Sequence, residues 1–136
     1  MADEAIIVEL LGANHDGDPI RYTCADATGI AKGSVMELTT PRTVVQSTNV
    51  DRPIVGIAAA EKVANDGETS IAVLTNCIVQ LKCATTQCEL GEYVSANATD
   101  NNITLASTLD SEKGWAVGKA LETIAVGATG LVRVLK

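Results

Sequence analysis

The sequence predicts an all-β fold: a single β-barrel or sandwich-like domain with two related halves. The first observation is a repeat, since the run Val55-Gly56-Ile57-Ala58 returns as Val117-Gly118-Lys119-Ala120. Gly33-Ser34-Val35 and Gly91-Glu92-Tyr93-Val94 open the two copies, so matched positions are 58 to 62 residues apart. A unit of that size is too small to bury a good core alone, which favours two halves folded against each other.

Composition and turn spacing are the second and third observations. Hydrophobic residues make up 46% of the 136 residues, but there is no Phe, one Trp and two Tyr. A core of small and β-branched side chains suits pleated sheets better than helical bundles. Turn-forming residues separate short apolar runs at roughly 8 to 12 residues, a spacing typical of β-barrels and sandwiches.

The elements are predicted in chain order as follows. Residues 1–18 are interpreted as an N-terminal arm and loop, because the apolar run 6–11 is followed by many turn formers. A single β domain follows over 19–136, with half-repeats at about 33–74 and 91–135. Its predicted strands span residues 20–25, 35–38, 43–46, 69–74, 77–83, 103–105 and 131–135. In 77–83 the odd-numbered residues share the core face, while Gln80 and Lys82 mark the solvated face.

Two stretches have helical as well as β character. Residues 57–65 and 117–126 place apolar side chains at helical spacing, so one or two short helices are an alternative there. Flanking glycines limit each helix to about two turns, which is marginal without tertiary support. We favour a strand followed by a loop in both stretches.

Charge and hydropathy narrow the classes of partner. The net charge of −7 and pI near 4.5 oppose binding to phosphate backbones, so we expect no nucleic-acid partner. No apolar run approaches the roughly 18 residues of a membrane span, and the start of the chain lacks a signal peptide's positive charge. We therefore expect synthesis in a cytoplasm and no membrane partner.

Four cysteines are expected to be reduced in that compartment. Cys83 and Cys88 flank a four-residue stretch, and a hairpin there would bring them within reach of a disulfide. Buried thiols are the favoured interpretation, with a disulfide and a metal site as alternatives. Cys77 shares the apolar face of its strand, which favours core packing.

No residue pattern predicts catalysis, a metal site or a cofactor. His15 is the single histidine and lies among turn residues, so we interpret it as a solvated turn residue. Residues 29–34 resemble a phosphate loop, but Lys32 precedes Gly33, and this order does not allow the phosphate-binding mechanism. Asp100, Asp110 and Glu112 lie in polar stretches and are interpreted as solvated loop carboxylates. The sequence therefore predicts a protein that is not an enzyme.

Glycine turns and apolar strand residues recur in a fixed order: Gly17-Asp18-Pro19-Ile20, Gly29-Ile30, Gly33-Ser34-Val35, Val55-Gly56-Ile57-Ala58, Gly67-Glu68, Ile71-Ala72-Val73, Gly91-Glu92-Tyr93-Val94, Val117-Gly118-Lys119-Ala120-Leu121-Glu122 and Val132-Arg133-Val134. With these motifs, the sequence from about Asp18 to Lys136 resembles the small capsid decoration, or cement, proteins of tailed phages.

This resemblance implies a β-barrel-like subunit, usually a homotrimer, on the outer surface of an assembled phage head. There it would stabilise the virion by bridging neighbouring copies of the major capsid protein. By analogy with N-terminal segments that lie along the capsid, four apolar residues are contact candidates: Ile6, Ile7, Leu10 and Leu11. An ordinary first strand of the barrel is the alternative for this segment.

Two other functions remain open at the level of sequence. A carrier domain of the biotinyl or lipoyl type also has two related halves, and its modified lysine would be Lys62 or, next, Lys82. An enzyme whose site is shared between subunits is the second alternative, and it would show converging polar groups in an interface pocket.

Overall fold

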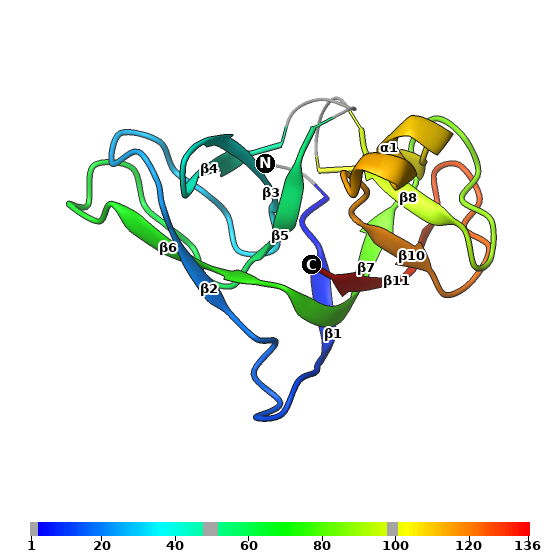
Figure 1. The fold of residues 1–136 in the computed structure, drawn as a ribbon, viewed down its shortest axis with the longest axis horizontal. Helices are drawn as coiled ribbons and strands as arrows, with labels where there is room; N and C mark the ends of the chain where they lie inside the picture. The colour runs from blue at the N-terminus through cyan, green and yellow to red at the C-terminus, as the bar shows by residue number, and fades with distance from the viewer. Residues whose placement is uncertain (1–2, 48–51, 98–100) are drawn as a thin grey trace.

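The computed structural model describes residues 3–47, 52–97 and 101–136, and it confirms the all-β fold (Figure 1). The elements are β1 Ile6–Leu10, β2 Ile20–Thr23, β3 Val35–Thr40, β4 Thr43–Gln46, β5 Ile54–Ala58, β6 Ser70–Leu74, β7 Asn76–Lys82, β8 Tyr93–Ala96, β9 Ile103–Leu105, α1 Thr108–Lys113, β10 Gly118–Ala120 and β11 Thr129–Leu135.

The strands form two units that lie side by side in Figure 1. The first unit is a closed barrel in the order β2-β4-β3-β5-β6, and the second is a six-stranded sheet in the order β1-β7-β11-β10-β8-β9. A parallel bridge between Cys83 and Ile103 joins the end of β7 to β9, as the parallel pair Thr23 and Thr43 joins β2 to β4. Without β1, the second unit therefore has the same strand order and the same parallel closure as the first. We call the two units the first barrel and the second barrel.

The correspondence between the barrels holds at the level of single hydrogen bonds. The N–H of Gly33 donates to the carbonyl O of Ala58 at 3.0 Å, and the N–H of Gly91 donates to Ala120 at 2.9 Å. The loops show the same correspondence. Ile30 and Lys62 exchange two backbone hydrogen bonds in the first barrel, and Cys88 and Ile124 exchange two in the second. These matched pairs lie at the sequence offsets that predicted two related halves.

Glycine is required at one matched position of each barrel. A Cβ on Gly56 would collide with the carbonyl O of Leu74, and a Cβ on Gly118 would collide with that of Arg133. Both glycines lie where neighbouring strands approach too closely for any side chain. The repeated Val-Gly motif therefore reflects backbone packing that both barrels share.

Two clusters of buried side chains form the core. The smaller one fills the first barrel and includes Met36, Val44 and Val73. The larger one fills the second barrel with the predicted inward residues of β7, Cys77, Val79 and Leu81 among them. It also contains four buried residues from strands of the first barrel: Val35, Ile54, Ile57 and Leu74. The outer face of the first barrel is thus buried against the rest of the molecule.

Strand β1 lies where we expected an N-terminal arm. It pairs antiparallel with β7, with Ile7 opposite Val79 and Leu10 opposite Cys77, and a bulge falls between Ile7 and Glu9. The N–H of Ala5 just before it donates to the carbonyl O of Gly33 in the first barrel at 2.9 Å. The segment therefore contacts both barrels and extends the sheet of the second.

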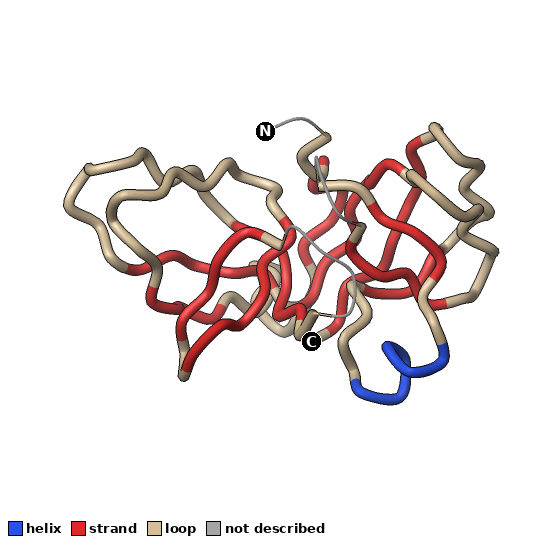
Figure 2. Tube along the Cα trace, turned by 90° about the horizontal axis from the view of Figure 1, so that it is seen from above, coloured by secondary structure: helices blue, strands red, loops and turns tan. Residues whose placement is uncertain are grey.

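The helical stretches are resolved in favour of strand and loop. Residues 57–65 contain the end of β5 followed by loop, and residues 117–126 contain all of β10 followed by loop, with no helix in either stretch. Helix α1 lies elsewhere, at Thr108–Lys113, and is blue in Figure 2. Its N-terminus is capped by Ser107, whose Oγ accepts a hydrogen bond from the N–H of Asp110 at 3.1 Å. The sequence patterns did not predict this helix, because its residues are mostly polar and show no apolar residues at helical spacing.

Candidate functional site

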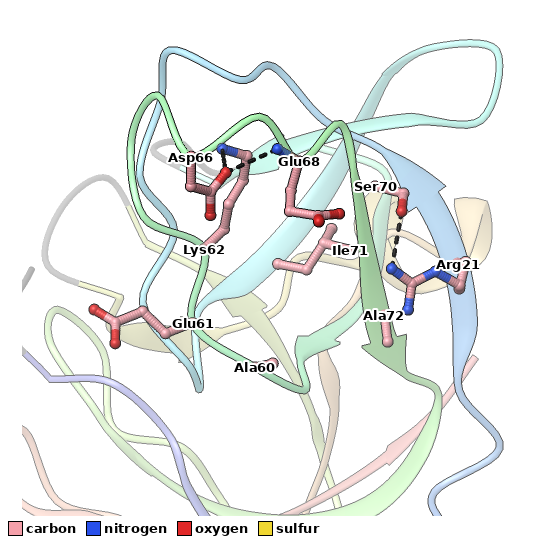
Figure 3. Close-up of a pocket in the computed structure, with 9 residues that line it drawn as sticks. All are labelled: Arg21, Ala60, Glu61, Lys62, Asp66, Glu68, Ser70, Ile71 and Ala72. Atoms are coloured by element: carbon pink, nitrogen blue, oxygen red, sulfur yellow. Dashed lines mark hydrogen bonds and ion pairs between the residues drawn. The ribbon is translucent and has the colours of Figure 1, made fainter.

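The most concentrated set of polar contacts surrounds Lys62 in the first barrel, beside a hollow formed with β2 and β6 (Figure 3). Lys62 Nζ donates to the carbonyl O of Asp26 at 2.8 Å and to that of Val63 at 3.1 Å. It also contacts the carboxylates of Asp66 at 3.1 Å and Asp26 at 3.4 Å. One ammonium group thus joins the loop after β2 to the loop before β6.

The electrostatics keep this cluster charged. Burial opposes the charge on Lys62, but hydrogen bonds to Asp66 and Asp26 outweigh it and raise the pKa of Lys62. The pKa of Asp66 is lowered, first by the backbone N–H of Glu68 at 2.9 Å and then by Lys62. The ammonium and the Asp66 carboxylate therefore persist at neutral pH as a clamp between loops.

This geometry disfavours the carrier-domain alternative. Lys62 is only 4% exposed, whereas a lysine that receives a prosthetic group must be accessible to the attaching enzyme. Lys82 lies at the end of β7 opposite Thr129, and its ammonium lies 3.8 Å from the Asp3 carboxylate. Neither lysine lies at the tip of a tight hairpin.

The four cysteines are buried free thiols. Cys88 Sγ lies 3.2 Å from Cys83 Sγ, and Cys83 Sγ donates to the carbonyl O of Thr86 at 3.0 Å. Burial, followed by the neighbouring Cys83, raises the pKa of Cys88 to about 12, and burial raises that of Cys77 to about 11. The Cys77 and Cys88 thiols are therefore neutral at physiological pH and poorly suited to nucleophilic attack.

Neither a metal-ligand cluster nor a membrane-spanning helix is found in the described residues. No group of three or more His, Cys, Asp or Glu in the described ranges is placed to hold a metal ion. His15 is an exposed turn residue, as expected. No helix in this part of the chain is long and apolar enough to cross a membrane.

One carboxylate interpreted as solvated is buried. Asp110, in α1, is buried, and its Oδ2 accepts a hydrogen bond from Ser95 Oγ at 2.8 Å. The interpretation was wrong for Asp110 because the helix turns this side chain toward β8. Glu112 is exposed, as expected, but it lies in α1 and not in a loop, while Asp100 lies outside the described residues.

Asn101 joins the two barrels, a role that sequence reasoning missed. Its Oδ1 accepts from the N–H of Val35 at 2.7 Å, and its Nδ2 donates to the carbonyl O of Gly33 at 2.9 Å and of Asp3 at 3.2 Å. Asn101 has a φ of 62°, a left-handed conformation that Asn tolerates well. The residue type was a signal for a turn, but nothing in the sequence identified its partners.

The outer face of the second barrel carries a row of side chains that cross neighbouring strands. Tyr93 on β8 pairs with Lys119 on β10, which pairs in turn with Arg133 on β11. These three residues line a surface hollow together with Gly118 and Leu135. We call Tyr93, Lys119 and Arg133 the exposed row. A signal for it was present, since Lys119 is the polar member of the second Val-Gly repeat.

The predicted contact residues divide into two groups. Ile6 is 60% exposed and lies opposite Gln80, on the outer side of the sheet, near Val8, which is 51% exposed. Ile7 and Leu10 are half-buried and pack against the larger core cluster, and Leu11 is half-buried after the end of β1. Of the four candidates, Ile6 is the one whose side chain is free to meet another molecule.

One family model matches most of the chain. The family model described as phage cement protein matches residues 14–135 of the chain. No curated protein matches the sequence. Among solved structures, the head fiber gp8.5 N base of bacteriophage phi29 aligns with a TM-score of 0.48 and 11% sequence identity, covering 85% of this chain and 92% of that chain.

Proposed function

The chain belongs to the phage cement protein family, and on that premise we propose that it binds the outer surface of an assembled phage head and bridges neighbouring copies of the major capsid protein. The observation that carries the proposal is the extent of the family match, which covers both barrels. Membership itself indicates a structural role in a phage head.

Buried polar side chains that connect separate parts of the molecule support a mechanical role. Lys62 holds two loops of one barrel together, and Asn101 holds the two barrels together. The thiols with raised pKa are packed into the core. These residues serve to make a rigid body, and rigidity favours bridging because little conformational freedom is lost on binding.

Binding of this kind would stabilise the shell by linkage. A protein that binds one shell state and not the other favours that state by about 2.7 kcal/mol per site when its free concentration is ~100-fold above Kd. A shell offers many identical sites, so the contributions accumulate. We propose that the favoured state is the expanded shell, which must resist the pressure of packaged DNA.

The proposed position and assembly follow from charge and family. A net charge of −7 disfavours contact with a packaged genome, so the outer surface is the better location. We propose a homotrimer, which would present three copies of each contact surface and gain affinity by multivalency. Among the apolar residues of β1, Ile6 is the proposed capsid contact.

Sedimentation with capsids tests the proposal. Purified protein is added to closed expanded shells and to unexpanded shells, the shells are pelleted, and the mass of the free protein is measured by light scattering. We expect cosedimentation with the expanded shells and a trimeric mass in solution. A monomer that pellets with neither shell would overturn the proposed function. Binding to shells that are already closed also identifies the site as external.

A further inference from the structure

The internal repeat assigns each residue of the exposed row a counterpart in the first barrel. In the first barrel Val35 pairs with Ile57, which pairs with Leu74. In the second, Tyr93 pairs with Lys119, which pairs with Arg133. The glycine before the middle residue fixes the alignment, since Gly56 and Gly118 each approach the carbonyl of the third residue of their own row.

The two rows have opposite environments. Val35, Ile57 and Leu74 are buried and belong to the core cluster that contains Ala5 of the N-terminal segment. Tyr93 is 48% exposed, Lys119 is exposed, and Arg133 is half-buried. The face that mediates packing in the first barrel is therefore uncovered in the second.

The exposed row also has unmatched hydrogen-bond donors. Arg133 donates through one Nη to Asn76 Oδ1 at 2.7 Å, but its buried Nε has no acceptor among the described residues. Lys119 Nζ lies 5.4 Å from the centre of the Tyr93 ring, and register places it directly beside Arg133. The residues lining the hollow include no carboxylate, although the chain carries seven more acidic than basic side chains.

We propose that the exposed row, together with the exposed side chain of Leu135, is the docking surface for a carboxylate-bearing segment of the major capsid protein. This inference rests on the proposed function and names its contact chemistry. Lys119 Nζ would donate a charge-assisted hydrogen bond to a partner Asp or Glu, and the half-buried guanidinium of Arg133 beside it would add positive charge to the site. Tyr93 and Leu135 would cover apolar parts of the same segment. A single partner carboxylate is favoured over a phosphate backbone, because the acidic remainder of this chain would repel the other charges of an extended polyanion.

A charge reversal with a matched control tests the docking surface. Lys119→Glu is compared with Lys32→Glu, which makes the same change at an exposed loop residue of the first barrel. Binding to expanded shells is measured by titration and sedimentation, and folding by thermal melting. We expect Lys119→Glu to bind at least about tenfold more weakly than wild type, with an unchanged melting temperature. Lys32→Glu should bind like wild type.

The outcomes separate this inference from the proposed function. Undiminished binding of Lys119→Glu would overturn the docking surface and leave the proposed function standing. If wild type pelleted with neither shell, both would be overturned. A changed oligomeric mass for Lys119→Glu, with capsid affinity unchanged, would assign the row to contacts between copies of this chain and also overturn the inference.

Zero-length cross-linking provides a second readout. A carbodiimide condenses an amine and a carboxyl group into an amide, and the water lost converts the carbodiimide to its urea. Applied to the complex of wild-type protein and expanded shells, it should join Lys119 to an Asp or Glu of the major capsid protein, identified by mass spectrometry. Cross-links from Lys119 only to another copy of this chain would contradict the assignment.

Discussion

Asn101 Oδ1 accepts a hydrogen bond from the backbone N–H of Val35 at 2.7 Å, so a loop residue of the second barrel holds the start of β3 in the first. The same side chain donates to the carbonyl O of Gly33 and of Asp3. Three backbone groups that lie 66, 68 and 98 residues from Asn101 in the sequence thus depend on one amide side chain.

Replacing this amide should destabilise the junction between the barrels. Asn101→Ala leaves buried backbone groups without partners, and we expect a loss of about 2–4 kcal/mol in the free energy of unfolding, measured by urea titration. Asn65→Ala is the control, because Asn65 has a similar φ of 61° but is exposed. It should cost only about 1 kcal/mol of backbone strain. Equal losses in the two variants would show that the buried hydrogen bonds contribute little.

Adding a methyl group at Gly118 should disturb the pairing of β10 and β11. The new Cβ would meet the carbonyl O of Arg133, so we expect Gly118→Ala to destabilise the protein by roughly 1–3 kcal/mol or more. Gly67→Ala is the comparison, since nothing lies within 4 Å of its Cβ position and only its φ of 87° opposes a side chain. Thermal melting of both variants measures the difference. A smaller effect at Gly118 than at Gly67 would contradict the steric argument.

The Lys62 clamp should stabilise the first barrel across a wide pH range. The raised pKa of Lys62 means that its contribution is complete below its ordinary value of 10.5 and is lost as pH rises through the raised value. The lowered pKa of Asp66 means that its contribution is complete above 3.8 and is lost as pH falls through the lowered value. The clamp is therefore intact between these limits.

Lys62→Met should consequently melt at a lower temperature than wild type at pH 7, whereas Lys82→Met, at a half-buried strand end, should melt close to it. The difference between wild type and Lys62→Met should shrink in acid below pH 3.8, as Asp66 becomes protonated. If the difference in melting temperature stayed constant into strong acid, Asp66 would not be the carboxylate through which Lys62 stabilises the barrel.

Cys83 and Cys88 should form a disulfide when an oxidant reaches them. Their Sγ atoms are 3.2 Å apart, so little movement is needed. Oxidised glutathione would take up the two electrons and two protons and leave as two reduced molecules. Burial and the raised pKa of Cys88 leave little thiolate, so we expect the reaction to be slow at pH 7 and faster at higher pH. Alkylation after unfolding, with peptide mass analysis, should find Cys24 and Cys77 unpaired. Pairing of either with another cysteine would contradict the geometry.

Ile6 should contribute to capsid affinity without contributing to the fold. Ile6→Asp places a charge on the exposed side of β1, and we expect weaker binding to expanded shells at an unchanged melting temperature. Ile7→Asp instead buries a charge against the core and should lower the melting temperature markedly. If Ile6→Asp bound as wild type does, β1 would not be a capsid contact.

Local patterns predicted the fold because β alternation and glycine turns are short-range signals. The run 77–83 was assigned correctly to a strand with Cys77, Val79 and Leu81 inward, and the Val-Gly repeat correctly indicated two related halves. Helix α1 was missed because its stabilising features are a Ser107 cap and a following glycine, Gly114 at a φ of 71°, not an apolar stripe.

The candidate site could be predicted less well, because its residues meet only across strands. Lys119 is the polar member of a repeated motif, but the sequence alone assigned it no role, and its neighbours Tyr93 and Arg133 are set by strand register. Asn101 is 66 residues from Val35, a separation at which sequence carries no local signal. A single sequence therefore did not predict the contacts that depend on long-range strand pairing.

Strand β1 affects how the chain acquires its fold. It leaves the ribosome before the other described strands, but its partner β7 begins at Asn76, after all five strands of the first barrel. During synthesis β1 therefore has no strand partner while the first barrel is being translated. An unpaired apolar strand makes the nascent chain prone to aggregation. Closure of the β1–β7 pair is a long-range event, which makes it a slow step in folding. The order of synthesis thus exposes β1 to wrong partners until the second half of the chain has emerged.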